Sequence, residues 1–318
     1  MSDSIFKAVF SPSLPQGGSL GVFSPSRYAE PAWFEEMKKR VEAEGYKLVV
    51  HQQNSLRKGW LAGEDESKAA ALMELFLDPK IDAIMCARGG TGALRFLDLL
   101  DYDVIAKKPK PFIGFSDVTC LLSAITRKTG MVTYHGPMGW NFIEEEFTVQ
   151  TCDDLFKMIG AGSSPKEISF PQASVVRNGD AKGILLGGNM SLLQCLAGTP
   201  YDLNVPHSIL FIEDVEEPLY RLDRMMAHLR MAGRFDGVRA VLVGDMVNIE
   251  DAVPNPSEPA DAWYGKGVEE IMLDHLPSDI PIAFDVPCGH GKYTTTLPVG
   301  AEVNLSLAPT GVSMSFAL

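Results

Sequence analysis

The feature that most constrains the fold is a regular alternation of short apolar runs with amphipathic segments between residues 19 and 130. The apolar runs predict strands at 19–26, 46–51, 81–87 and 111–115, and the intervening segments predict helices at 31–45, 67–78 and 116–130. Strands that alternate with helices of this length are joined by right-handed crossovers, which make neighbouring strands parallel. This part of the chain is therefore expected to form a parallel sheet covered by helices.

The alternation fades near residue 145, and a more mixed pattern follows. Segment 183–199 is expected to form a strand, a glycine turn and a helix; strands are expected at 208–214, 239–245 and 280–286, a helix at 218–233, and a hairpin at 301–318. We therefore predict an α/β protein with a Rossmann-like parallel-sheet domain at 1–150, a linker at 151–180 and a mixed α/β domain at 181–318.

The charge and the cysteines of the 318-residue chain exclude several classes of protein. A net charge of −13 at pH 7 repels phosphate backbones and anionic lipid, so we expect neither nucleic acid nor a membrane surface as partner. No uninterrupted apolar run reaches the length of a membrane span. The five cysteines are widely spaced and form no C-x-x-C pair, which favours a reducing compartment. We expect a cytoplasmic protein without a secretory signal.

The most informative local pattern is Gly114-Phe115-Ser116-Asp117, where a predicted strand runs directly into an amphipathic helix. Such a tight turn exposes a serine hydroxyl and points helix N-terminal N–H groups at the same place, as in a nucleophile elbow. Val118 stands where the second glycine of the G-x-S-x-G motif is usual, so the motif is incomplete. A competing interpretation is that Ser116 only caps the following helix.

A nucleophilic serine needs a base, normally a histidine held by a carboxylate. His135 and His290 lie in glycine-flanked loops after apolar strands, and loops at the carboxyl ends of strands line the crevice of an open α/β sheet. His290 is the stronger candidate base, and His135 is expected to line the pocket. Glu213 ends the apolar run 209–212 and is the candidate carboxylate; the nearby acids Asp214, Glu216 and Glu217 remain alternatives.

An oxyanion hole needs two N–H donors. The backbone of Asp117 is expected to supply one, and the turn Arg88-Gly89-Gly90-Thr91-Gly92 the other, since its backbone can approach a substrate closely. The turn does not match the motif of a nucleotide phosphate loop, because Arg95 stands where the third glycine of that motif belongs. No H-E-x-x-H pattern is present, so we expect no metal and no cofactor. Asn189 is expected either to contact substrate or to form a turn.

These residues lie in segments that resemble the LD-carboxypeptidase family, peptidase family S66, whose members include the microcin C immunity hydrolases. The resemblance runs in order over nearly the whole chain: residues 20–26, 83–95, 112–119, 134–138, 183–200, 210–229 and 288–303. It implies a Ser–His–Glu triad of Ser116, His290 and Glu213, an oxyanion hole of the Gly90 and Asp117 N–H groups, and a homodimer. It also implies a cytoplasmic serine peptidase that releases the terminal D-alanine of muropeptide tetrapeptides in peptidoglycan recycling.

Two departures from the family pattern leave the triad unchanged, and the first of them is expected to alter the pocket and hence the substrate. Thr91 replaces an aromatic residue often found in the glycine turn, and about eighteen residues precede the first predicted strand. The alternative within the enzyme class is an immunity-type serine hydrolase of acyl-adenylate conjugates. The alternative outside it is a non-catalytic protein that binds a small molecule.

Overall fold

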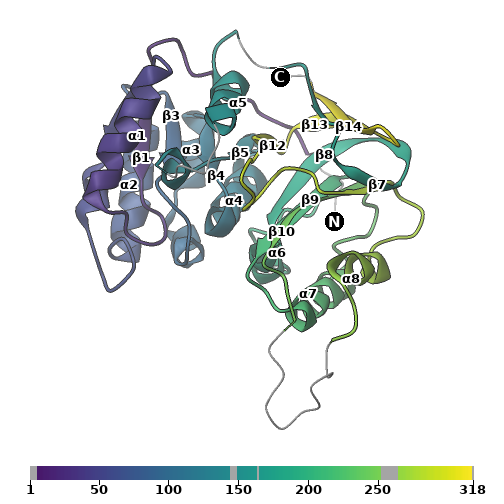
Figure 1. The fold of residues 1–318 in the computed structure, drawn as a ribbon. Coiled ribbons are helices and arrows are strands. Elements are labelled where there is room, and N and C mark those ends of the chain that lie inside the picture. Colours follow the sequence, from purple (N-terminus) through teal and green to yellow (C-terminus); the bar gives the residue numbers. More distant parts are fainter. Residues whose placement is uncertain (1–5, 144–148, 163–164, 252–263, 317–318) are drawn as a thin grey trace.

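Two sheets, each covered by helices, lie side by side in the protein (Figure 1). The structure is a computed structural model that describes residues 6–143, 149–162, 165–251 and 264–316. The first sheet has six strands in the order β12-β5-β4-β3-β1-β2. All neighbouring pairs in it are parallel except β12 with β5. The predicted parallel sheet is therefore confirmed.

The strands of the first sheet are β1 (Ser19–Phe23), β2 (Lys47–Val50), β3 (Ala83–Cys86), β4 (Phe112–Gly114), β5 (Thr133–His135) and β12 (Leu297–Val299). Its helices are α1 (Pro31–Ala43), α2 (Asp65–Leu77), α3 (Tyr102–Lys107), α4 (Thr119–Thr129) and α5 (Val149–Ile159), with short 3₁₀ turns η1 (Gln52–Ser55), η2 (Ala93–Leu99), η3 (Ser116–Val118) and η4 (Gly139–Phe142). The helix at α1 buries Phe34, Met37 and Val41, the face that the helical spacing predicts.

The second sheet has eight strands in the order β6-β14-β13-β8-β9-β10-β11-β7. They are β6 (Glu167–Phe170), β7 (Ser174–Arg177), β8 (Gly179–Asn189), β9 (Ile209–Val215), β10 (Ala240–Val247), β11 (Ile282–Phe284), β13 (Glu302–Ala308) and β14 (Gly311–Phe316). The four central strands β8 to β11 are parallel and the outer strands are antiparallel, as expected for a mixed α/β unit. The helices are α6 (Met190–Leu196), α7 (Leu219–Met231) and α8 (Val268–His275).

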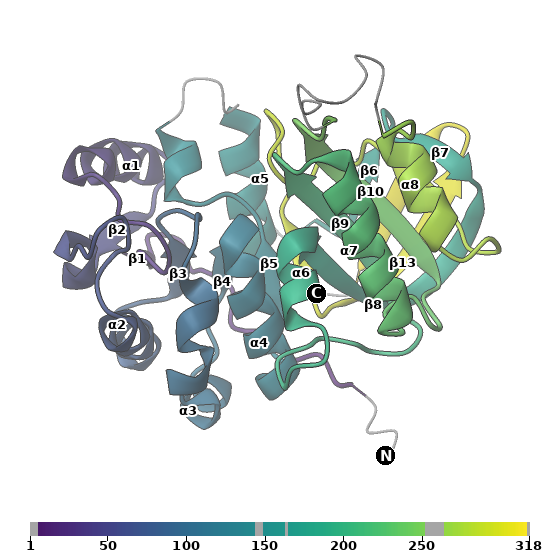
Figure 2. The same ribbon diagram turned by 90° about the horizontal axis from the view of Figure 1, so that it is seen from below.

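The two units share strands and core. Strand β12 follows the second sheet's β11 in the chain but pairs with β5 of the first sheet. Helices α4 and α6 lie next to each other where the units meet (Figure 2). One large apolar cluster extends through both units, and a second lies beneath α7 and α8. Within the described ranges, no helix combines the length and apolar character that a membrane span requires.

The segment 151–180, predicted as a linker, is largely ordered secondary structure. It contains most of α5, and its strands β6 and β7 pair with β14 and β11 at the two edges of the second sheet. In β6 the residues alternate between exposed and less exposed positions, a short strand pattern that the flanking Pro165 and Pro171 obscured. Residues 163–164, in the same segment, and 144–148, next to the expected boundary at 150, lie outside the described residues. The domain boundaries themselves remain a prediction.

The expected glycine turn near residue 187 is wrong: Gly187 and Gly188 continue strand β8. Their φ angles are +148° and +134°, values that side-chain-bearing residues rarely adopt. A Cβ on Gly187 would lie 1.8 Å from the Phe211 carbonyl oxygen, and one on Gly188 would lie 2.7 Å from the Thr119 side chain of α4. The glycines therefore let β8 approach both β9 and the first unit closely.

We predict that Gly187→Ala destabilises the protein by about 3 kcal/mol or more, because a methyl group meets a backbone oxygen and the φ angle is unfavourable. The matched control is Gly198→Ala, at an exposed glycine with φ +83° and no atom within 4 Å of the added Cβ. That control should cost about 1 kcal/mol. Urea denaturation measures both, and equal losses would contradict the close approach.

Candidate active site

Ser116 lies in a strained turn at the carboxyl end of β4. Its φ angle is +60°, and η3 begins at Ser116 and leads into α4. A Cβ on Gly114 would lie 2.6 Å from Val118 Cγ1, so the turn needs a glycine there. The helix-cap interpretation of Ser116 is wrong, because the N-cap positions of η3 and α4 are Phe115 and Val118. Strained non-glycine residues of this kind cluster at functional sites.

Glu213 and His290 form a close pair from the second unit. Glu213 lies near the end of β9 with its side chain fully buried, and its Oε2 is 2.6 Å from His290 Nδ1. The loop residue Gly289 has φ +124°, and a Cβ there would lie 2.7 Å from the same carboxylate oxygen. Glycine is therefore required before His290 so that the loop can approach Glu213.

The pair shifts both pKa values. Burial alone would raise the pKa of Glu213, but the neighbouring imidazoles of His290 and His135 outweigh it and lower the pKa to about 2. Burial lowers the pKa of His290, while the Glu213 carboxylate raises it, and the net direction is upward. The arrangement therefore favours an ionised carboxylate that orients the imidazole through Nδ1.

The Ser116 segment and His290 are neighbours. The ring of Phe115, next to Ser116 in the chain, lies edge-on to the His290 ring with centroids 4.9 Å apart. Among the described residues no hydrogen bond joins the Ser116 hydroxyl to His290, whose Nε2 has no hydrogen-bond partner there. Nucleophile–base hydrogen bonds are often long or misaligned in enzymes without substrate. Phe115, which precedes Ser116, thus lies beside the Glu213–His290 pair, although these residues come from three distant segments of the chain.

His135 and Asp245 complete the surroundings of Glu213. His135 ends β5, is fully buried, and has its Nε2 3.7 Å from Glu213 Oε1. Asp245 accepts a hydrogen bond from the Gly291 N–H at 3.1 Å, and burial raises its pKa to about 6. Sequence reasoning overlooked Asp245, although it follows an apolar run much as Glu213 does.

Two of the alternative acids have other partners, and the third, Glu216, is exposed with a φ angle of +58°. Asp214 accepts hydrogen bonds from Asn189 Nδ2 at 2.9 Å and from the Ser191 N–H at 2.9 Å. Glu217 forms an ion pair with Arg221 at 3.1 Å. Asn189 is buried and its Oδ1 accepts the Leu192 N–H at 3.3 Å, so it caps α6. Glu213 is the acid of this group that contacts His290.

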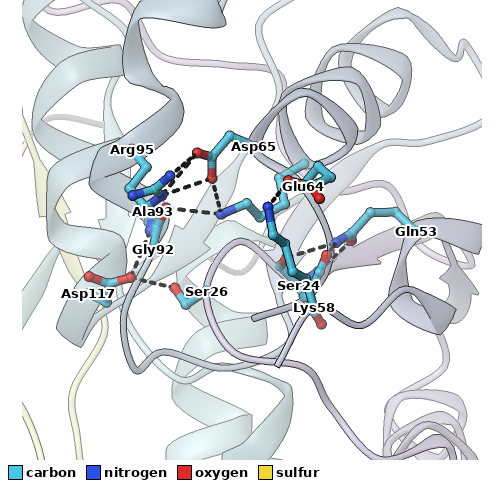
Figure 3. A network of polar contacts seen from close by, with 12 residues as sticks. Ser24, Ser26, Gln53, Lys58, Glu64, Asp65, Gly92, Ala93, Arg95 and Asp117 are labelled. Atoms are coloured by element: carbon cyan, nitrogen blue, oxygen red, sulfur yellow. Dashed lines mark hydrogen bonds and ion pairs between the residues drawn. The ribbon is translucent and has the colours of Figure 1, made fainter. Parts of the chain in front are cut away.

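The glycine turn 88–92 lies against Ser116 and is held in place by hydrogen bonds at its C-terminal end. A Cβ on Gly89 would lie 3.1 Å from Ser116 Cβ, while Gly90 is exposed with φ +121°. Asp117 Oδ2 accepts hydrogen bonds from the Ala93 N–H at 2.9 Å and from Ser26 Oγ at 2.6 Å, as Figure 3 shows. The residue after Ser116 therefore fixes the turn through its side chain.

A buried lysine provides the second anchor. Lys68 has no exposed side-chain surface; its Nζ donates to the Gly92 carbonyl at 3.1 Å and lies 2.9 Å from Asp65 Oδ1. Asp65 also binds Arg95, which Figure 3 shows beside the turn. Lys68 was not predicted, because a lysine within an amphipathic helix is typical of a solvated face.

Comparison with known proteins identifies the family. Residues 20–136 match the model of the LD-carboxypeptidase N-terminal domain, and residues 182–305 match that of the C-terminal domain. A Bacillus subtilis protein named as a probable murein peptide carboxypeptidase is 31% identical over 96% of this chain and 94% of its own length. A murein tetrapeptide carboxypeptidase of Pseudomonas aeruginosa is 28% identical over 90% of this chain and 92% of its own.

A solved structure agrees with these sequence matches. The crystal structure of an MccF-like protein from Bacillus anthracis superposes with a TM-score of 0.85 at 27% identity, covering 97% of this chain and 99% of that one. The resemblance of the sequence segments and the two-unit fold are both confirmed. The chain belongs to the LD-carboxypeptidase family.

Proposed function

We propose that this protein is a serine carboxypeptidase that cleaves an L,D-peptide bond and releases the terminal D-alanine of muropeptide tetrapeptides. The observation that carries the proposal is the buried Glu213–His290 pair at 2.6 Å beside the strained Ser116 turn. Family membership and the two relatives named for murein peptides support the substrate class. We further propose a homodimer in the cytoplasm, as the family resemblance implies.

In the proposed mechanism, Glu213 accepts the Nδ1 proton of His290 in a hydrogen bond and so leaves Nε2 free to act as base. Nε2 takes the Ser116 proton while Oγ attacks the carbonyl carbon of the scissile amide. His290 then gives that proton to the leaving amine as the C–N bond breaks. Water, deprotonated by the same imidazole, hydrolyses the acyl-enzyme and restores the serine.

The negative charge that develops on the carbonyl oxygen needs donors already in place. We propose the backbone N–H groups of Gly90 and Asp117 for this role. The anchoring of the turn by Lys68 and the Asp117 side chain supports the assignment, because fixed donors require no reorganisation during the reaction. Arg88, Gly89 and His135 remain our proposed substrate-pocket residues. The sequence also suggested Asn189, but its side chain is buried and hydrogen-bonded to Asp214 and to the Leu192 N–H, which fits the alternative role at a turn.

We predict that Ser116→Ala lowers kcat by about 10⁴- to 10⁶-fold, because the attacking oxygen is lost. Ser55→Ala, at an exposed serine of η1, is the control and should leave turnover unchanged. Steady-state release of D-alanine measures both. Near-normal turnover by Ser116→Ala would exclude the mechanism.

We also predict that the purified protein releases D-alanine from an L,D-linked tetrapeptide faster than it cleaves an aminoacyl-adenylate conjugate. Mass spectrometry of the products of both reactions makes the comparison. Faster cleavage of the conjugate would favour the immunity-type hydrolase. If neither substrate is cleaved and a serine-directed phosphonate forms no adduct at Ser116, the protein is a non-catalytic one that binds a small molecule.

The pH dependence should follow His290, which acts as base only when neutral. Since Glu213 raises the pKa of His290 above its ordinary value of 6.5, kcat/KM should increase as the pH rises through that elevated pKa. In Glu213→Gln the carboxylate is gone and burial lowers the imidazole pKa. The rising limb should therefore move to lower pH, and kcat should fall by about 10⁴-fold.

Asp245→Asn is the control for this profile, because Asp245 also titrates at a pKa of about 6. We expect the Asn variant to keep the rising limb, with a smaller shift to lower pH. If the rising limb disappears in Asp245→Asn but stays in place in Glu213→Gln, the limb reports the titration of Asp245. That result would contradict the role of His290.

A further inference from the structure

Two arginines stand beside the glycine turn that contacts Ser116. Arg27 follows β1 and Arg88 follows β3, and these strands are neighbours in the first sheet. A Cβ on Gly90 would lie 2.5 Å from Arg27 Cδ, so the Arg27 stem lies directly against Gly90. On the same turn, Gly89 lies against Ser116. Arg27 is thus separated from the reactive serine by a single turn of backbone.

Neither arginine has an anionic partner. Across the described residues the guanidinium groups of Arg27 and Arg88 form no hydrogen bond and no ion pair, and the Nε atom of each is buried without a partner. Burying a charged donor without a partner is costly, so such groups are normally paired. Arg95 illustrates the usual case nearby, since its guanidinium binds Asp65 at 2.8 Å.

Aromatic rings hold both guanidinium groups in place instead. Arg27 lies over Trp60 at 4.9 Å, and Arg88 lies 5.4 Å from the Trp33 ring and 5.5 Å from the Trp140 ring. The two tryptophans meet edge-on with centroids 4.4 Å apart. Stacking orients a guanidinium without occupying its N–H groups, which remain available to a ligand.

The two positive charges also influence each other. Burial lowers the pKa of Arg88, and the charge of Arg27 lowers it further. A bound anion would relieve this repulsion and supply the missing hydrogen-bond acceptors. In a chain with a net charge of −13, two unpaired arginines beside a reactive serine are a local exception to the overall charge.

We infer that Arg27 and Arg88 form a carboxylate-binding subsite that holds the free terminal carboxylate of the substrate. This inference rests on the proposed function and names the group that the site recognises. A carboxypeptidase must distinguish the end of a chain from its middle, and a guanidinium fork matches a carboxylate. The terminal carboxylate lies about one residue, roughly 3.8 Å, beyond the attacked carbonyl. The Arg27 stem lies against Gly90, the proposed oxyanion donor, and Arg88 belongs to the same glycine turn, so both arginines border the place of that carbonyl.

The first test compares a tetrapeptide that ends in D-alanine with the same peptide ending in D-alaninamide. Wild-type protein should prefer the acid. Arg27→Met and Arg88→Met keep the apolar stem and remove the charge, so each should lower kcat/KM for the acid by roughly 30-fold. Each should leave kcat/KM for the amide close to the wild-type value, which also shows that the variant is folded.

Arg57→Met is the matched control. Arg57 also stacks on a ring, Tyr28 at 3.7 Å, but it is exposed and its Nε donates to the Gly59 carbonyl at 3.1 Å. It should keep the full preference for the acid. The inference is overturned if wild-type protein does not prefer the acid, or if Arg27→Met and Arg88→Met retain that preference.

A binding measurement separates this inference from the proposed function. Titration calorimetry with the Ser116→Ala protein measures affinity for the acid and the amide without cleavage. One outcome supports the subsite and contradicts the proposed function. In it, wild-type protein cleaves neither peptide, Ser116→Ala binds the acid more tightly than the amide, and the double variant Ser116→Ala/Arg27→Met binds the two equally. Equal affinity for acid and amide overturns the subsite.

The same anion chemistry could recognise a phosphate of a nucleotide conjugate. Adenosine 5′-monophosphate is therefore titrated into the same proteins. If the nucleotide binds more tightly than the peptide acid, and Arg27→Met abolishes that binding, the subsite recognises phosphate. This outcome would overturn the inference that it recognises a carboxylate. Weaker nucleotide binding supports the carboxylate.

Discussion

A fully buried carboxylate, Glu213, is the constraint on which the arrangement of the site depends. A buried ionised group must be paired, and His290 Nδ1 supplies the hydrogen bond to Glu213 Oε2 at 2.6 Å, while His135 Nε2, from the other unit, lies 3.7 Å from Oε1, beyond hydrogen-bond distance. His135 ends a strand of the first sheet, whereas Glu213 lies near the end of a strand of the second. Gly289 leaves the space that the carboxylate occupies, and Gly244 lets the Cys288 segment approach β10. The same side chain thereby joins the two sheets and orients the proposed base.

The first unit supplies the other half of the site as a prearranged surface. Ser116 and the glycine turn follow adjacent strands, and Asp117 and the buried Lys68 hold the turn from beneath. Polar anchors of this kind keep backbone N–H groups in position, which is what stabilisation of a developing oxyanion requires. Arg88 lies in that turn and Arg27 lies against it, and the guanidinium groups of both have no hydrogen-bond or ion-pair partner among the described residues, so they fit the carboxylate subsite that we infer.

Local patterns predicted much of this architecture. The apolar runs located the strands, helical spacing located the buried face of α1, and the strand-to-helix turn located Ser116. The patterns failed where a residue's role depends on a distant neighbour. Gly187 was expected in a turn because nothing local reveals that the Phe211 carbonyl lies beside it. Strands β6 and β7 were taken for a linker because short edge strands carry little apolar signal.

By itself the sequence determined many of the strands and helices, the parallel character of the first sheet and the candidate serine, histidine and acid, because these follow from periodicity and from residues at strand ends. Only the tertiary structure decided which acid contacts which histidine and that β12 crosses to the first sheet. It also decided that Lys68 is paired while Arg27 and Arg88 find no hydrogen-bond or ion-pair partner in the part of the chain that the structure describes. The physical reason is that pairing and burial depend on the distance between segments far apart in the chain, which local patterning does not encode.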